Sequence, residues 1–273
     1  MWPTTDISPA DDPYGPGMNI AVAVRLMPKA GEELELDESG RDIDREYVDM
    51  TLCDFDEQAL EEAVLIKEAT GATVTAVGLK ADGIDEALRV AYARGADRVV
   101  VADAGELDPY DTRTAALAFA DAFRRLAPDL VLVGVQTPYD IFGQTAPLVA
   151  AELGWPQANV VVQVTVDGDG ARVEQEYAGG RLAVLGLPLP AIAGVQSASK
   201  PPRYVSMARL RSAMTEANPE PLDVSVTAPA ATPRIVSLAR PEPKSHATML
   251  DGDAAEVAEQ ILSVMRERGA LVS

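Results

Sequence analysis

Cysteine and histidine are almost absent from this chain, in which Cys53 and His246 are the only ones among 273 residues. A single thiol excludes an internal disulfide framework and any zinc or iron–sulfur site built from several cysteines. A single imidazole in a stretch without periodicity argues against a metal pair and against a Ser/His/Asp or Cys/His catalytic set. Aromatic residues make up only 5% of the chain, so we expect a core built mainly from Ala, Val, Leu and Ile.

Basic residues are also scarce, with 23 Lys and Arg against 43 Asp and Glu and a net charge of −20. This balance argues against binding nucleic acid or an anionic membrane surface, both of which need clustered cations. No apolar run approaches the roughly 18–20 residues that cross a bilayer. Residues 1–17 contain four prolines and no Lys or Arg, so they resemble neither a signal nor a transit peptide. We expect a disordered leader over 1–17 and a cytoplasmic protein.

Short β-branched runs alternate with helical periodicity from residue 18 onward. Strands are expected over 20–24, 74–78, 98–101 and 130–134, with helices between them. Asp56 is the expected N-cap of the first helix, which Gly71 ends; Gly95 ends the second, and Asp111 or Thr112 begins the third. This alternation predicts a parallel sheet covered by helices on both faces.

The rhythm changes after Gln157. Apolar alternation over 160–166, 172–177 and 182–187 predicts an antiparallel meander, with 167–170 as a hairpin turn rather than a calcium loop. Residues 197–250 show little periodicity, which suggests an extended arm lying on another polypeptide. Asp253 and Glu256 then begin a final helix with a capping box. We therefore expect a core domain over 18–196, and a docking loop, arm and terminal helix over 197–273.

The most informative segment for function follows the strand ending at Gly134. Ligands of open parallel sheets bind at the carboxyl ends of strands, and the helix beginning near Thr145 offers free backbone N–H groups there. Gln144 and Thr145 add neutral donors, and no lysine occurs between Gly134 and Ala146. These features favour a phosphate held by backbone amides near Gly143, although an ordinary strand–helix turn fits the same pattern.

The same segment carries a family resemblance. Residues 134–157, ending Leu-Gly-Trp-Pro-Gln, closely resemble a signature of electron-transfer flavoprotein β subunits. The resemblance recurs in chain order at Ala21-Val22-Ala23-Val24-Arg25, Phe55-Asp56-Glu57, Ala59-Leu60-Glu61-Glu62-Ala63, Gly95-Ala96-Asp97-Arg98, Gly179-Gly180, Leu187-Pro188 and Pro202-Arg203-Tyr204. It spans Met18 to Met214. It implies a Rossmann-like, three-layer α/β fold of the adenine-nucleotide α-hydrolase type, with an antiparallel extension and a C-terminal arm ending in a helix.

The resemblance also implies roles for matched positions. Those expected to bind cofactor are Ala23, Cys53, Phe55, Leu79, Thr137, Asp140, Gly143, Gln144 and Thr145, with Phe55 near the partner's flavin ring. Those expected to dock partners are Glu176, Arg203, Tyr204 and Met207. The implied cofactors are FAD, held mainly by an α subunit, and AMP or a second FAD in this chain. The implied partners are that α subunit, an acyl-CoA or related dehydrogenase and a quinone oxidoreductase, without membrane insertion.

Several positions depart from the family pattern. Cys53-Asp54 stands where Asn-Pro is usual, and Gly143 replaces a frequent Asn. Pro28, Asp111-Thr112 and the long C-terminal arm resemble prokaryotic branches related to electron bifurcation. The resemblance implies an electron carrier of fatty acid oxidation that is redox-active only as a heterodimer and is not itself an enzyme. The main alternative is a stand-alone adenine-nucleotide sensor of the stress-protein type, which would need a glycine-rich phosphate loop that the sequence lacks.

Overall fold

The computed structural model describes residues 17–29, 34–167, 170–227, 232, 234–241 and 247–270. These residues fall into two compact units, of which one ends at Val236 and the other begins at Ser237. The leader expected over 1–17 lies outside the described residues except for Gly17, as do His246 and the centre of the turn at 168–169.

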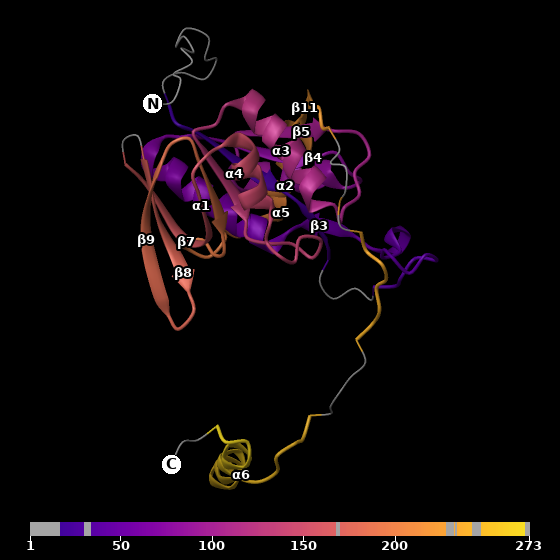
Figure 1. Ribbon diagram of the computed structural model, residues 1–273, viewed down its shortest axis with the longest axis vertical. Coiled ribbons are helices and arrows are strands. Elements are labelled where there is room, and N and C mark those ends of the chain that lie inside the picture. The colour runs from indigo at the N-terminus through magenta and orange to yellow at the C-terminus, as the bar shows by residue number, and fades with distance from the viewer. Residues whose placement is uncertain are drawn as a thin grey trace. The chain divides into compact units, whose positions relative to one another are not determined.

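A nine-stranded sheet forms the centre of the first unit in the described part of the chain, in the order β11-β5-β4-β1-β6-β10-β7-β8-β9 (Figure 1). Its strands are β1 (Asn19–Val24), β4 (Thr73–Leu79), β5 (Arg98–Asp103), β6 (Leu130–Gly134), β7 (Gln157–Asp167), β8 (Gly170–Tyr177), β9 (Arg181–Pro188), β10 (Ala191–Val195) and β11 (Glu220–Asp223). All neighbours from β11 to β7 pair in parallel, whereas β7, β8 and β9 are antiparallel. The predicted α/β fold with an antiparallel extension is confirmed.

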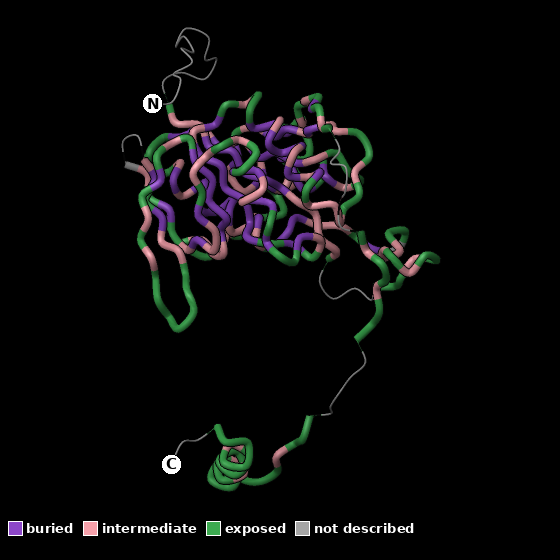
Figure 2. Tube along the Cα trace, in the orientation of Figure 1, coloured by how far each residue is buried: buried purple, intermediate pink, exposed green. Residues whose placement is uncertain are grey.

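Helices cover both faces of this sheet, which gives three layers. The helices are α1 (Asp54–Thr70), α2 (Ile84–Arg94), α3 (Thr112–Leu126), α4 (Thr145–Leu153) and α5 (Met207–Glu216). Side chains alternate along β1, so that Ile20, Val22 and Val24 pack with α1 and α2 while Ala21 and Ala23 pack with α3 and α4. Two apolar cores result, and buried residues are concentrated in the sheet and its helices (Figure 2).

A separate two-stranded sheet follows β1 in the chain. β2 (Leu26–Pro28) pairs antiparallel with β3 (Met50–Leu52), and a 3-10 turn (Arg45–Tyr47) lies between them in sequence. An antiparallel bridge between Leu36 and Ile43 closes a short hairpin in the loop between β2 and β3.

Two expectations about local structure are wrong. The predicted N-cap, Asp56, is instead the third residue of α1, which begins at Asp54 and whose N-cap position is Cys53. Asp56 is fully buried, and an ion pair with Arg25 compensates its charge. Residues 197–250 also contain regular structure: β11 extends the sheet beside β5, and α5 packs near α2.

The second unit contains helix α6 (Ala254–Glu267). Asp253 caps it, and the side chain of Glu256 completes the predicted capping box. No residue of α6 is buried, and Ile261 and Val264 are 46% and 42% exposed. Throughout the described part of the chain, no helix combines the length and apolar character that a membrane crossing requires.

Candidate functional site

A cavity opens at the carboxyl edge of the sheet, where β1 lies between β4 and β6. The helices that follow these strands cover opposite faces, so this is the topological switch point at which doubly wound sheets bind ligands. The cavity measures about 160 Å³. Its walls contain Val24, Arg25, Leu26, Arg45, Met50, Leu79, Lys80, Ala81, Ile84, Leu107, Asp108, Pro109, Thr112, Ala115, Phe119, Thr137, Tyr139, Asp140 and Thr145.

A buried ion pair lies at the floor of this cavity. The Nη2 atom of Arg25 is 2.7 Å from Oδ1 of Asp56, whose side chain is 0% exposed. Asp56 also accepts hydrogen bonds from the backbone N–H groups of Arg25 and Gly134. Burial opposes the charge on Arg25, but Asp56 holds the pKa of the guanidinium above its ordinary value; burial raises the pKa of Asp56, partly offset by Arg25. The pair fixes the guanidinium of Arg25 toward the cavity.

Gly134 permits this arrangement because the start of α1 approaches the end of β6 closely. A Cβ atom at this position would lie 2.5 Å from the carbonyl carbon of Phe55 and 2.6 Å from the backbone nitrogen of Asp56. The same residue accepts a hydrogen bond from Arg25 at its carbonyl oxygen. A glycine is therefore required at this point, because any Cβ atom would clash with the backbone of α1.

Asp140 fills the N-terminus of α4. Its carboxylate accepts hydrogen bonds from the backbone N–H groups of Gln144 and Thr145, both at 2.9 Å, and from the Thr145 hydroxyl at 2.6 Å. The N–H of Gly143 donates to the carbonyl oxygen of Asp140. The amides expected to hold a phosphate near Gly143 thus all donate to Asp140 in this structure. This arrangement follows from the preference of helix N-termini for a carboxylate.

Three loops meet at the mouth of the cavity. The rings of Tyr110 and Tyr139 contact edge to face at 5.1 Å, and the guanidinium of Arg45 lies 5.4 Å from the centre of the Tyr139 ring. Asp42 accepts a hydrogen bond from the Tyr110 hydroxyl at 3.0 Å and forms an ion pair with Arg45 at 3.2 Å. In contrast, the buried hydroxyl of Tyr139 has no hydrogen-bond partner among the described residues. We call Asp42, Arg45, Tyr110 and Tyr139 the mouth cluster.

The structure brings only some of the expected cofactor-binding residues to the cavity. Leu79, Thr137, Asp140 and Thr145 line it. Among the described residues, those expected to bind cofactor but absent from its walls are Ala23, Cys53, Phe55, Gly143 and Gln144. Arg25, Arg45 and Lys80 also line the cavity, although the sequence analysis did not assign them to the site. The cavity therefore contains a lysine, even though the segment from Gly134 to Ala146 has none. Arg25 directly follows a predicted strand, which could have identified it, whereas Arg45 lies in a loop with no periodic signal.

Cys53 is a buried side chain that stands close to the ion pair. It is 1% exposed, and its Sγ donates to the carbonyl oxygen of Gln136 at 3.6 Å. Burial, together with the negative charge of Asp56, raises the pKa of the thiol to about 12. The thiol is therefore protonated at neutral pH, and the position at the start of α1 does not activate it.

The four expected docking residues lie away from this cavity. Tyr204 and Met207 are 89% and 59% exposed, Glu176 is exposed on β8, and Arg203 is half-buried. Two adjacent carboxylates of α1 hold the segment before Tyr204. Glu61 receives hydrogen bonds from the backbone and guanidinium of Arg203, and Glu62 receives them from the backbone N–H groups of Val164 and Ser199. The two carboxylates of α1 thus anchor both ends of residues 199–203, and the next residue, Tyr204, is exposed.

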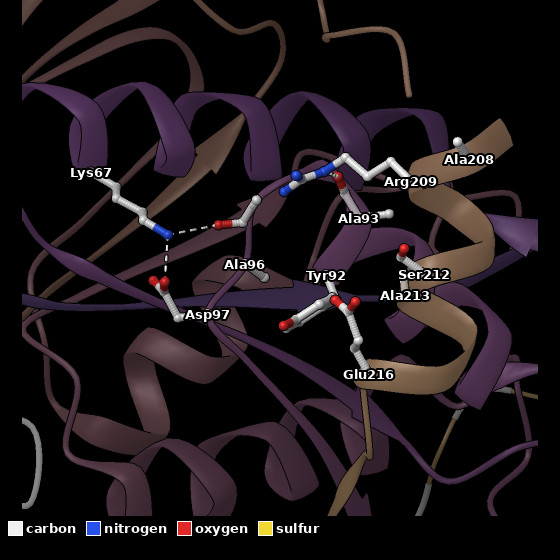
Figure 3. Close-up of a pocket in the computed structure, with 11 residues that line it drawn as sticks. Lys67, Tyr92, Ala93, Ala96, Asp97, Ala208, Arg209, Ser212, Ala213 and Glu216 are labelled. Carbon is white, nitrogen blue, oxygen red and sulfur yellow. Dashed lines mark hydrogen bonds and ion pairs between the residues drawn. The ribbon is translucent and has the colours of Figure 1, made fainter. Parts of the chain in front are cut away.

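A larger cavity of about 570 Å³ lies between α5 and the segment joining α2 to β5 (Figure 3). Its cations are already engaged, because Lys67 donates to the Gly95 carbonyl oxygen and to Asp97, and Arg209 donates to the Ala93 carbonyl oxygen. Asp97 directly precedes β5, so this cavity lies at the amino edge of the sheet rather than the carboxyl edge. Position and chemistry both favour the smaller cavity as the ligand site.

Comparison with known proteins identifies the family to which the chain belongs. Residues 41–229 match the family described as "Electron transfer flavoprotein domain". A protein of Methylophilus methylotrophus named "Electron transfer flavoprotein subunit beta" is 31% identical over 261 residues, covering 92% of this chain and 98% of that protein. A protein of the same name from Bradyrhizobium diazoefficiens is 30% identical over 264 residues, covering 93% and 100%. One from Sus scrofa is 37% identical over 165 residues, covering 58% and 63%.

Proposed function

Because this chain belongs to the electron transfer flavoprotein family as a β subunit, we propose that it pairs with an FAD-carrying α subunit. In this heterodimer, the chain forms a base that positions the flavin of its partner. The flavin supplies the redox chemistry, and the protein sets its position and surroundings. Electrons pass from an acyl-CoA or related dehydrogenase, through the flavin, to a quinone oxidoreductase or another acceptor, in the cytoplasm.

The cavity at the switch point is the proposed site for a nucleotide, either AMP or the adenylate part of a second FAD. The observation that carries this proposal is the convergence of Leu79, Thr137, Asp140 and Thr145 on one cavity at the carboxyl edge of the sheet. The unpartnered hydroxyl of Tyr139 in the same wall supports it, because a buried donor without an acceptor is costly unless a ligand supplies one.

The exposed apolar surfaces are the proposed contacts with other polypeptides. Tyr204 and Met207 form a docking surface for a dehydrogenase, and a flexible thioether suits a surface that fits several partners. Within its own unit, α6 has an unburied apolar stripe at Val257, Ile261 and Val264, which the α subunit covers.

Co-expression tests this function. The full chain is purified alone and together with the α subunit encoded in the same organism, and each product is denatured so that released nucleotides can be identified by mass. We expect a yellow, reducible heterodimer only in the second preparation. One FAD and one AMP per heterodimer indicate a simple carrier, and two FAD indicate a bifurcating one. A colourless homodimer that binds adenine nucleotide without any partner would contradict the proposal and favour a sensor.

A further inference from the structure

Strand β7 contains an extra residue where it pairs with β10. The register between the two strands shifts there, so that Asn159 and Val160 together oppose Gly194. As a result, Ala158 and Val161 both lie in the apolar core on the side of α1, although strict alternation would place them on opposite faces of the sheet. The strand therefore has a β-bulge at Asn159 and Val160.

This bulge retains two unfavourable features. Val160 has a φ of 57°, in the left-handed region that a β-branched side chain rarely adopts. The Oδ1 atom of Asn159 is buried and has no hydrogen-bond partner among the described residues. Both features cost free energy, and such costs are concentrated at functional sites, where the surrounding structure imposes them.

The side chain of Asn159 connects the bulge to the start of α4. Its Nδ2 atom donates to the carbonyl oxygen of Gly143 at 3.2 Å. Its amide group also fills the space above Gly194, where an added Cβ atom would overlap Oδ1 of Asn159. The residue at position 194 must therefore be glycine for Asn159 to reach Gly143.

The peptide group that Asn159 holds also contains the N–H of Gln144. This peptide is planar and trans, so the carbonyl oxygen of Gly143 and the N–H of Gln144 point in opposite directions. The N–H donates to the carboxylate of Asp140 at 2.9 Å, on the side of α4 that faces the cavity residues Asp140 and Thr145. A hydrogen bond at the carbonyl oxygen thus sets the direction of the N–H at the other end of the peptide.

We propose that Asn159 is a positioning residue for the nucleotide site, although it does not line the cavity. By holding the peptide between Gly143 and Gln144, it fixes the turn that presents the start of α4 to the ligand. The bulge permits this, because the extra residue lets Asn159 reach α4 while its neighbours remain in the opposite core. This role rests on the nucleotide site proposed above and adds a residue of β7 to it.

The test compares the unmodified heterodimer with Asn159→Ala and Gly194→Ala. Each is purified with its α subunit and diluted, and the loss of bound adenine nucleotide is followed by mass spectrometry, alongside the Tm. Asn159→Ala removes the donor, whereas the new methyl group of Gly194→Ala displaces the Asn159 side chain. We expect the nucleotide to leave about tenfold faster from either variant than from the unmodified heterodimer.

A double variant separates positioning from packing. When Asn159→Ala and Gly194→Ala are combined, the methyl group at position 194 occupies the space that the amide leaves. We therefore expect the Tm to return toward that of the unmodified heterodimer, while the nucleotide still leaves about tenfold faster. Asn218→Ala, at an exposed asparagine, is the matched control and should change neither quantity.

Three outcomes overturn the role of Asn159. It is wrong if nucleotide retention recovers together with the Tm in the double variant, because Asn159 would then act only through packing. It is equally wrong if both single variants keep their nucleotide as firmly as the unmodified heterodimer does. If the unmodified heterodimer holds no adenine nucleotide besides the FAD of its α subunit, the proposed nucleotide site itself fails, which distinguishes that failure from the loss of a positioning residue.

Discussion

Arg25 and Asp56 join the end of β1 to the first turn of α1 through an ion pair of 2.7 Å, with side chains 12% and 0% exposed. Charges at such depth are costly unless hydrogen bonds satisfy them. Here the carboxylate accepts from two backbone N–H groups as well as from the guanidinium, and the guanidinium also donates to the Gly134 carbonyl oxygen. The pair therefore connects β1, α1 and β6 beneath the cavity.

Removing the charge of Asp56 should destabilise the chain strongly. Asp56→Asn leaves the buried guanidinium of Arg25 without its main partner, so we expect the free energy of unfolding to fall by about 3–5 kcal/mol. Urea denaturation measures this change. Asp54→Asn, at the exposed first residue of the same helix, is the control and should cost no more than about 0.5 kcal/mol. A loss below 1 kcal/mol for Asp56→Asn would show that the pair is not a structural requirement.

A methyl group at position 134 should not be tolerated. In Gly134→Ala the new Cβ meets backbone atoms of Phe55 and Asp56, which cannot move without shifting α1. We expect a loss of about 1–3 kcal/mol or more in urea denaturation, and weaker nucleotide binding. Gly186→Ala on β9 is the matched control, because a Cβ there meets nothing within 4 Å. Equal stability of the two variants would contradict the close approach.

The thiol of Cys53 should be unreactive in the folded chain. Because burial raises its pKa to about 12, only about one thiol in ten thousand is ionised at pH 8. Iodoacetamide followed by mass spectrometry should detect almost no labelling of native protein and complete labelling in denaturant. Rapid labelling of the native chain at pH 7 would show an accessible thiolate and would require a different environment for this residue.

The carboxylate of Glu62 should be needed to hold the segment before the exposed Tyr204. Glu62→Ala leaves the N–H groups of Val164 and Ser199 without their acceptor, so we expect a loss of about 2–4 kcal/mol in stability. Amide hydrogen exchange should rise at residues 198–203. Glu68→Ala removes an exposed partner of Arg203 from the same helix and should cost at most about 1 kcal/mol. Unchanged exchange in Glu62→Ala would contradict the anchoring role.

Local sequence signals predicted most elements because each depends on neighbouring residues. The apolar run at 130–134, the glycine that ends α1 and the capping box at Asp253 are all visible within a few residues, and the structure confirms them. The short strand β11 was missed because its sequence, Glu-Pro-Leu-Asp, has little strand propensity and forms only by pairing with β5. Edge strands commonly tolerate such residues.

The sequence by itself determined the parallel sheet, its antiparallel extension and the family, because hydrophobic periodicity and spaced motifs are local properties of the chain. Only the tertiary structure decided what surrounds the cavity. Asp56 lies 31 residues from Arg25, and the phenolic oxygen of Tyr110 reaches Asp42 across 68 residues. Contacts over such separations leave no periodic pattern in the sequence. Asp56 neutralises a buried guanidinium, rather than capping a helix, because the folded sheet brings the ends of β1 and β6 to the start of α1.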